Sequence, residues 1–138
     1  NSAVQRGATI YAELAGDGNS LSSYRITDSH PSGDGPIQAM RRAIYDAGAT
    51  EGDIDYLNAH GTSTPMNDRS ECAAVHAVFG ERAKRELDPD CDVDIVRDVP
   101  RQARIGMALS NSLGFGGSNS CLAFRHPEET AALIAAGR

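Results

Sequence analysis

The sequence predicts an α/β fold, because segments with the period of a strand alternate with segments with the period of a helix. Residues Ile10–Leu14 alternate apolar and polar side chains, as in a strand with one buried face. Residues 36–47 then place apolar side chains at helical spacing, between a proline suited to a first turn and a glycine suited to a stop. Two apolar strands near the end of the chain complete the pattern.

The other expected elements follow from the same rules. A helix should run from Pro65 to Phe79, with Thr64 as its cap, Gly80 as its stop, and an apolar stripe of Cys72, Val75 and Phe79. The remaining predictions are a loop at Asp17–Gly35, a buried strand at Asp53–Asn58, a charged loop at Glu81–Arg104, strands at Ile105–Leu109 and Cys121–Phe124, and a helix at Thr130–Ala136.

Length and charge limit the class of protein. With 138 residues the chain fits a single domain, 1–138, that can bury a core. Its net charge of −6 disfavours nucleic acid or an anionic membrane as the main partner, so neither is expected. No apolar run reaches the roughly 20 residues of a membrane helix, and no secretory signal begins the sequence, so a cytoplasmic protein is expected. The three cysteines are expected to be reduced thiols.

The first motif is residues 58–68, Asn-Ala-His-Gly-Thr-Ser-Thr-Pro-Met-Asn-Asp. It places His60 just after a predicted buried strand, at the strand end where α/β proteins commonly bind ligands. Gly61 allows close approach of the backbone, and hydroxyls follow before the next helix. Taken alone, the same spacing also fits a structural histidine beside a capping threonine.

The second motif is residues 111–119, Asn-Ser-Leu-Gly-Phe-Gly-Gly-Ser-Asn. Three glycines around Phe115 predict a turn with exposed amides, which could hold an oxyanion. A tight hairpin loop is the alternative. The run does not fit a dinucleotide-binding fingerprint, because Asn119 stands where the third glycine belongs.

Together, the two motifs resemble the β-ketoacyl carrier-protein synthases of the thiolase-like superfamily, closest to the type II elongation synthases. Further stretches are similar to this family: residues 6–13, Arg-Gly-Ala-Thr-Ile-Tyr-Ala-Glu; residues 28–33, Asp-Ser-His-Pro-Ser-Gly; and residues 53–56, Asp-Ile-Asp-Tyr. The resemblance implies the C-terminal half of a thiolase-like fold, a layered mixed sheet with flanking helices, here incomplete.

The resemblance also implies an activity, decarboxylative Claisen condensation in fatty-acid or polyketide synthesis. His60 matches the first of two histidines that stabilise charge on the malonyl thioester oxygen. Phe115 matches the residue that gives a backbone amide to the oxyanion hole and gates the acyl pocket. Thr62 and Thr64 match hydroxyls that contact the phosphopantetheine arm of acyl carrier protein. The implied partners are this carrier protein, the N-terminal half of the enzyme and a homodimer partner, with no cofactor or metal.

Two features of the family pattern are missing. No cysteine stands in the Ala-Cys-Ser context of the family's nucleophile, and no histidine follows a glycine, as the second catalytic histidine does. The family segment that carries this histidine is expected to be deleted between about residues 85 and 87. Asp68 and Glu71, which match carboxylates of a polar network, would lose their lysine there and are expected to be solvated.

Two hypotheses on function follow. The chain is either part of a condensing enzyme and inactive alone, or a catalytically dead ketosynthase-like partner that binds carrier protein. A metal site at Asp68, Cys72 and His76 is a weaker alternative, because apolar neighbours explain that helix face. The Arg41–Arg42 pair fits a solvated helix face or a carrier-protein contact, and His76 and His126 are expected at the surface.

Overall fold

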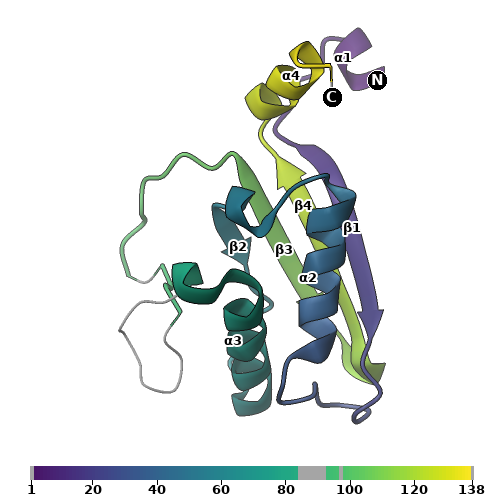
Figure 1. Ribbon diagram of the computed structural model, residues 1–138, viewed down its shortest axis with the longest axis vertical. Coiled ribbons are helices and arrows are strands. Elements are labelled where there is room, and N and C mark those ends of the chain that lie inside the picture. Colours follow the sequence, from purple (N-terminus) through teal and green to yellow (C-terminus); the bar gives the residue numbers. More distant parts are fainter. Residues whose placement is uncertain (1, 84–92, 97, 138) are drawn as a thin grey trace.

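The computed structural model of the protein describes residues 2–83, 93–96 and 98–137. Within these residues four strands form one sheet, with helices α2 and α3 to one side of it (Figure 1). The strands are β1 (Glu13–Leu21), β2 (Tyr56–Asn58), β3 (Met107–Leu113) and β4 (Ser118–Arg125). The helices are α1 (Ser2–Gln5), α2 (Asp34–Asp46), α3 (Pro65–Phe79) and α4 (Pro127–Ala135), with short 3₁₀ turns η1 (Glu51–Asp53), η2 (Gly80–Ala83) and η3 (Phe115–Gly117).

The sheet is mixed, with the strand order β1-β4-β3-β2. Strand β4 runs antiparallel to both β1 and β3, whereas β2 runs parallel to β3. The predicted α/β class, with a mixed sheet and flanking helices, is therefore confirmed. Because parallel strands end at the same edge of a sheet, the segments that follow β2 and β3 start side by side. These two segments carry the two motifs.

The core lies between the sheet and α2. On this face of the sheet Leu109 stands opposite Ala123, and Asn111 stands opposite Cys121. The buried side chains that α2 adds are Ala39, Met40, Ala43 and Ile44. On the other face the aligned residues, such as Ser110 and Leu122, are only half-buried. Of the described helices, α2 makes the extensive contacts with the sheet, so that second face stays open.

Strand β1 corrects two predictions, since it begins later than Ile10 and continues through residues expected to form a loop. The glycines in this segment predict a loop from composition, but in the strand they serve packing. A Cβ atom on Gly18 would lie 2.1 Å from the Ala39 carbonyl oxygen, and one on Gly16 would lie 2.5 Å from the Ala47 nitrogen. Glycine at these positions lets α2 lie directly against the strand.

The free edge of β1 is closed by two side chains of α2. The Asp46 carboxylate accepts a hydrogen bond from the Asp17 N–H at 3.0 Å. Arg42 donates to the carbonyl oxygen of Asn19. An edge strand with unpaired backbone groups invites pairing with another chain, and these contacts occupy two of those groups.

Helix α3 begins at Pro65 and ends before Gly80, as predicted. Two details differ. The Thr64 side chain makes no capping hydrogen bond, and the buried side of the helix is not the predicted stripe of Cys72, Val75 and Phe79, which are half-buried. The buried side chains of α3 are Asn67, Ser70, Glu71, Ala74 and Val78. The helix is rotated because its polar residues bond to the loop after β2.

The other elements differ from prediction mainly in their bounds. Residues 51–53 form a 3₁₀ turn, so the strand predicted at Asp53–Asn58 shortens to β2. Strands β3 and β4 extend into the second motif, because the glycine link closes as a hairpin. Helix α4 begins at Pro127, three residues early, where the exposed His126 caps it by accepting a hydrogen bond from the Glu128 N–H at 3.3 Å.

The described parts of the charged stretch are exposed except for buried Ala83 and half-buried Val93, and they contain no helix beyond η2, which fits the predicted loop. Asp94 and Arg101 form an ion pair there, at 2.7 Å. The deletion predicted near residues 85–87 and Cys91 lie outside the described residues. The prediction of reduced thiols is wrong for Cys72, which is disulfide-bonded, while Cys121 is a free, buried thiol. Among the described helices, none combines the length and apolarity needed to cross a membrane.

Candidate active site

The loop after β2 holds His60 and is tied to helix α3 by one carboxylate. The backbone N–H of His60 donates to Glu71 Oε1 at 2.7 Å, and the N–H of Gly61 donates to Oε2 at 3.0 Å. Glu71 is only 5% exposed. Both of its oxygens therefore fix the backbone at the histidine.

Glu71 has two further donors. Asn67, one turn earlier in α3, donates from Nδ2 at 3.3 Å, and Asn111 of β3 donates from Nδ2 at 3.5 Å, the long limit for a hydrogen bond. All four donors are neutral, and no ion pair of Glu71 occurs among the described residues. The prediction that Glu71 is solvated is thus wrong, because backbone and amide donors replace water around the buried carboxylate. Asp68 is exposed, as predicted.

The rest of the loop turns sharply away from the strand. Gly61 and Ser63 both have φ near 57°, the left-handed region. This turn brings the Thr62 and Thr64 hydroxyls to 3.4 Å from each other, and both residues are exposed. The His60 ring is half-buried and makes no hydrogen bond among the described residues. One short loop thus carries two exposed hydroxyls and an imidazole ring that makes no hydrogen bond among the described residues.

The second motif turns between β3 and β4, where Phe115 is 80% exposed. The N–H groups on either side of it are taken: Gly114 donates to Ser118 O at 2.7 Å, and Gly116 donates to Ile26 O at 2.7 Å. No hydrogen bond of the Phe115 N–H is found within the described residues. This amide is thus available to an external acceptor.

The two motifs meet at one edge of the sheet. Asn58, the last residue of β2, pairs with Ser110 of β3, and its Nδ2 donates to Ser110 Oγ at 3.2 Å. Glu71 bridges the His60 loop to Asn111, the first residue of the second motif. In the part of the chain that is described, no hydrogen bond or ring contact joins His60 to Phe115. The structure thus brings the two motifs to one edge of the sheet and joins them through Glu71, which contacts the His60 backbone and the Asn111 side chain.

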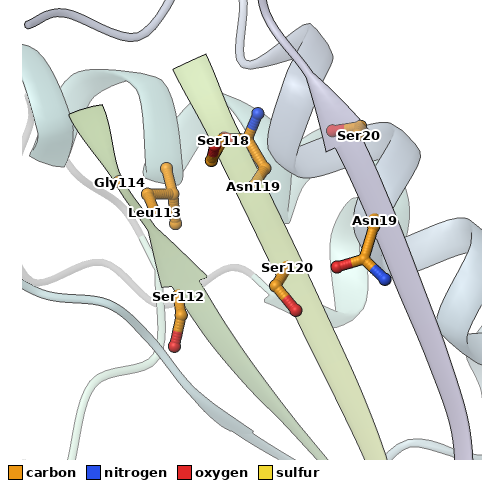
Figure 2. Close-up of a pocket in the computed structure, with 8 residues that line it drawn as sticks. All are labelled: Asn19, Ser20, Ser112, Leu113, Gly114, Ser118, Asn119 and Ser120. Atoms are coloured by element: carbon orange, nitrogen blue, oxygen red, sulfur yellow. The ribbon is translucent and has the colours of Figure 1, made fainter. Parts of the chain in front are cut away.

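A shallow hollow of about 380 Å³ lies beside the second motif (Figure 2). It is lined by Asn19, Ser20, Ser112, Leu113, Gly114, Ser118, Asn119 and Ser120. Most of these side chains are polar, and neither His60 nor Phe115 lines it. The hollow belongs to the hairpin and the end of β1.

The alternative metal site is not supported. Cys72 is disulfide-bonded, and the described residues contain no group of three or more metal-ligating side chains. His76 is half-buried instead of lying at the surface. Arg41 and Arg42 are exposed, but each guanidinium bonds to a backbone carbonyl, of Ala77 and of Asn19.

Three polar side chains at the site were missed by the sequence analysis: Asn67, Asn111 and Asn119, all buried. The sequence did contain a signal that Asn67 and Glu71 lie on the same side of α3. Asn67 and Glu71 are four residues apart, in phase with Ala74 and Val78, so they share the buried side of α3. No local signal marks the donors to Glu71 that come from other elements.

Solved structures similar to this fold include ketosynthases. A type II PKS acyl-carrier protein in complex with its ketosynthase aligns with a TM-score of 0.84 at 29% identity, covering 90% of this chain and 40% of that one. The ishigamide ketosynthase/chain length factor aligns with a TM-score of 0.82 at 30% identity, covering 91% and 40%. These neighbours define the class of protein as ketosynthase-like.

Sequence comparison identifies the family. The model of the C-terminal domain of β-ketoacyl synthases matches residues 11–96, so the chain belongs to the β-ketoacyl synthase family. Nodulation protein E of Rhizobium meliloti is 37% identical, over 89% of this chain and 40% of its own length. The 3-oxoacyl-[acyl-carrier-protein] synthase 2 of Staphylococcus aureus is 38% identical, over 90% and 41%. The chain spans about two fifths of the length of these relatives.

The alignment with a relative contains more positions than the number of residues that this chain contributes to it. The alignment with nodulation protein E covers 164 residues, whereas 89% of this 138-residue chain is about 123 residues. About 40 aligned positions therefore hold residues of the relative alone.

Proposed function

We propose that this chain is the C-terminal part of a β-ketoacyl synthase that forms a carbon–carbon bond by decarboxylative condensation. The observation that carries the proposal is the pair of loops at one sheet edge: a histidine held through its backbone by Glu71, beside a turn with a free amide at Phe115. The relatives named as 3-oxoacyl-[acyl-carrier-protein] synthases support it.

In the proposed reaction, the bond between the carboxylate carbon and C2 of a malonyl thioester breaks, and carbon dioxide leaves. The electron pair passes into an enolate, whose oxygen accepts a hydrogen bond from the His60 ring. The enolate carbon then attacks the carbonyl carbon of an acyl group held on a cysteine. The carbonyl oxygen becomes an oxyanion, which the Phe115 N–H stabilises, and the C–S bond breaks to release the cysteine thiolate.

Thr62 and Thr64 are proposed to contact the phosphopantetheine arm that carries the malonyl group. Their hydroxyls are exposed on the His60 loop, so they could reach an extended chain that ends at the histidine. The proposed partners are acyl carrier protein, an N-terminal half of the enzyme and a second subunit, within the cytoplasm. No step of the proposed chemistry requires a bound cofactor or metal.

The chain alone is proposed to be inactive, because it offers no suitable cysteine among the described residues. Cys72 is disulfide-bonded, and burial raises the pKa of the Cys121 thiol to about 12. A thiol with so high a pKa is protonated at neutral pH and is a poor nucleophile. Cys91 lies outside the described residues and lacks the Ala-Cys-Ser context of the family's nucleophile, so we propose that the nucleophile comes from outside this span.

A second candidate function is a catalytically dead partner of an active ketosynthase. Structural neighbours that pair a ketosynthase with a chain length factor favour this alternative.

The aligned positions without a counterpart in this chain support the proposal that the segment with the second catalytic histidine is absent.

The test is a chimera. An active relative supplies its N-terminal half and its segment with the second histidine, and this chain supplies the rest. Malonyl decarboxylation and condensation are measured with acyl and malonyl carrier proteins. Changing His60 to alanine should lower decarboxylation by roughly 10²–10³-fold, the effect of losing one donor to a developing oxyanion. A folded chimera that decarboxylates equally well with alanine at position 60 would contradict the proposal.

A further inference from the structure

The turn that carries Phe115 is fastened to the segment that follows β1. The Ser22 N–H donates to Gly117 O at 2.8 Å, and the Gly116 N–H donates to Ile26 O at 2.7 Å. These two backbone bonds run in opposite directions between the same pair of segments. The position of the turn therefore depends on residues 22–26.

Asn119, the last residue of the second motif, takes part in the same contact through its side chain. It is 4% exposed, and its Nδ2 donates to Gly117 O at 2.8 Å and to Ser22 Oγ at 3.0 Å. Because a carbonyl oxygen only accepts hydrogen bonds, the NH₂ group of Asn119 must face Gly117. One buried amide thus bonds to both segments at their junction. Figure 2 shows Asn119 near the start of β4, across from Ser20 of β1.

The start of helix α2 lies close to this amide. A Cβ atom on Gly35, in the first turn of α2, would lie 2.0 Å from Ser22 Oγ and 2.4 Å from Asn119 Nδ2. The Ser20 hydroxyl also donates to Gly35 O, at 2.6 Å. The start of α2 therefore packs directly on the Asn119 side chain.

The two glycines of the turn, Gly116 and Gly117, differ in the space available for a Cβ atom. Gly116 and Gly117 have φ of 77° and 79°, so alanine would be strained at either position. A Cβ on Gly117 would also lie 1.8 Å from Ser22 O, whereas one on Gly116 would meet nothing within 4 Å. Alanine at Gly117 alone would push the two segments apart.

We propose that Asn119 is the positioning residue for the Phe115 amide: its side chain locks residues 114–117 against Ser22, so that this N–H points at a fixed place. The neighbouring N–H groups of Gly114 and Gly116 are taken by Ser118 and Ile26, which leaves the Phe115 amide to serve an acceptor. The inference rests on the proposed function, since it assigns the amide to the acyl carbonyl oxygen.

The first test measures amide hydrogen exchange in the full chain. The change Asn119→Asp keeps the shape but replaces the two donated bonds with a carboxylate oxygen facing Gly117 O. Exchange at the Gly116 and Ser22 amides should rise at least tenfold, while the Leu109 and Ala123 amides in the strands stay within twofold. Ser22→Ala should give a smaller, local rise. Ser112→Ala, which changes another lining residue of the same hollow, is the control and should change none of them.

If Asn119→Asp does not fold, Ser22→Ala replaces it, because it removes the Oγ acceptor of Asn119 Nδ2. A rise in exchange at the Ser22 and Gly116 amides then supports the lock. Gly117→Ala, whose Cβ would meet Ser22 O whatever residue stands at 119, is the positive control for separating the two segments. Unchanged exchange at Gly116 and Ser22, or an equal rise at every amide, would overturn the proposal.

The second test uses the chimera. Asn119→Asp should reduce condensation by roughly 10²–10³-fold, as for loss of one oxyanion donor, and leave malonyl decarboxylation within threefold, because His60 stands on the other loop. A purely structural role would lower both rates together, and that result would overturn the proposal. A parent chimera that folds but shows neither reaction would instead reject the proposed function itself, and the assignment of the amide with it.

Discussion

The Glu71 carboxylate lies 2.7 Å from the backbone nitrogen of His60, eleven residues away in the sequence. Its second oxygen accepts from the Gly61 N–H at 3.0 Å. The histidine is therefore positioned through its main chain, and its ring remains free to act as a donor. A buried carboxylate on α3 thus controls where the loop after β2 lies.

Replacing Glu71 with alanine should destabilise the chain through this loop. The change leaves buried N–H groups without acceptors, so the free energy of unfolding should fall by about 1–3 kcal/mol. Urea unfolding followed by circular dichroism measures the loss. The matched control is Asp68→Asn on the same helix, which is exposed and should cost less than about 1 kcal/mol, the size of a helix-terminus effect. Equal losses in both variants would refute a special role for Glu71.

The packing of α2 on β1 predicts a steep difference between two glycine-to-alanine changes. Gly18→Ala places a Cβ 2.1 Å from the Ala39 carbonyl oxygen and should cost about 3 kcal/mol or more. Gly48 has φ of 63° with open space around it, so Gly48→Ala should cost only about 1–2 kcal/mol of backbone strain. Thermal and urea unfolding compare the two. The prediction is wrong if Gly48→Ala proves the more damaging change.

The buried thiol predicts a stability change at alkaline pH. Burial raises the pKa of Cys121 from its usual value near 9.0 to about 12, so the folded state disfavours the thiolate. Its contribution to stability is complete below pH 9 and is lost as pH rises towards 12. In Cys121→Ala this part of the pH dependence should disappear. Unfolding free energies at a series of pH values, with wild type as reference, give the comparison, and parallel curves would argue against it.

The turn before β2 predicts a shift at acid pH. Hydrogen bonds from the hydroxyl and N–H of Thr50, at 2.7 and 2.8 Å, hold the pKa of Asp53 below its usual value of 3.8. The stabilisation is therefore present above that value and is lost as pH falls through the lower, folded pKa. Thr50→Val should raise the pKa of Asp53, as followed by NMR titration. Thr9→Val, in the exposed segment before β1, is the control and should leave it unchanged.

The bounds of α3 and the end of α2 could be predicted well because prolines and glycines mark them locally. Pro65 and Gly80 enclose α3 as expected, and Gly48 follows α2. Strand β1 was missed in part, because Gly16 and Gly18 carry the composition of a loop while their role depends on a helix that follows later in the chain. A glycine's packing role cannot be separated from a turn until the neighbour is known.

The residues of the candidate site also fall into those that local sequence could predict and those that it could not. His60, Thr62, Thr64 and Phe115 were located from two local motifs, and the structure places them at the ends of β2 and β3. The burial of Glu71 was not predicted, because its donor Asn111 lies 40 residues away. The contact of Asn119 with Ser22 spans 97 residues and has no local signature. Contacts of this kind appear only when the sheet order is known.

The side chains that close the outer edge of β1 also affect where a further strand could add to the sheet. Asp46 and Arg42 occupy backbone groups that an added strand would need, so a strand joining at β1 would first have to displace two contacts from the packed helix. Of the two edge strands in the described residues, only β1 is guarded in this way. Within the described residues, β2, the strand that leads directly to His60, is therefore the less obstructed edge for an added strand.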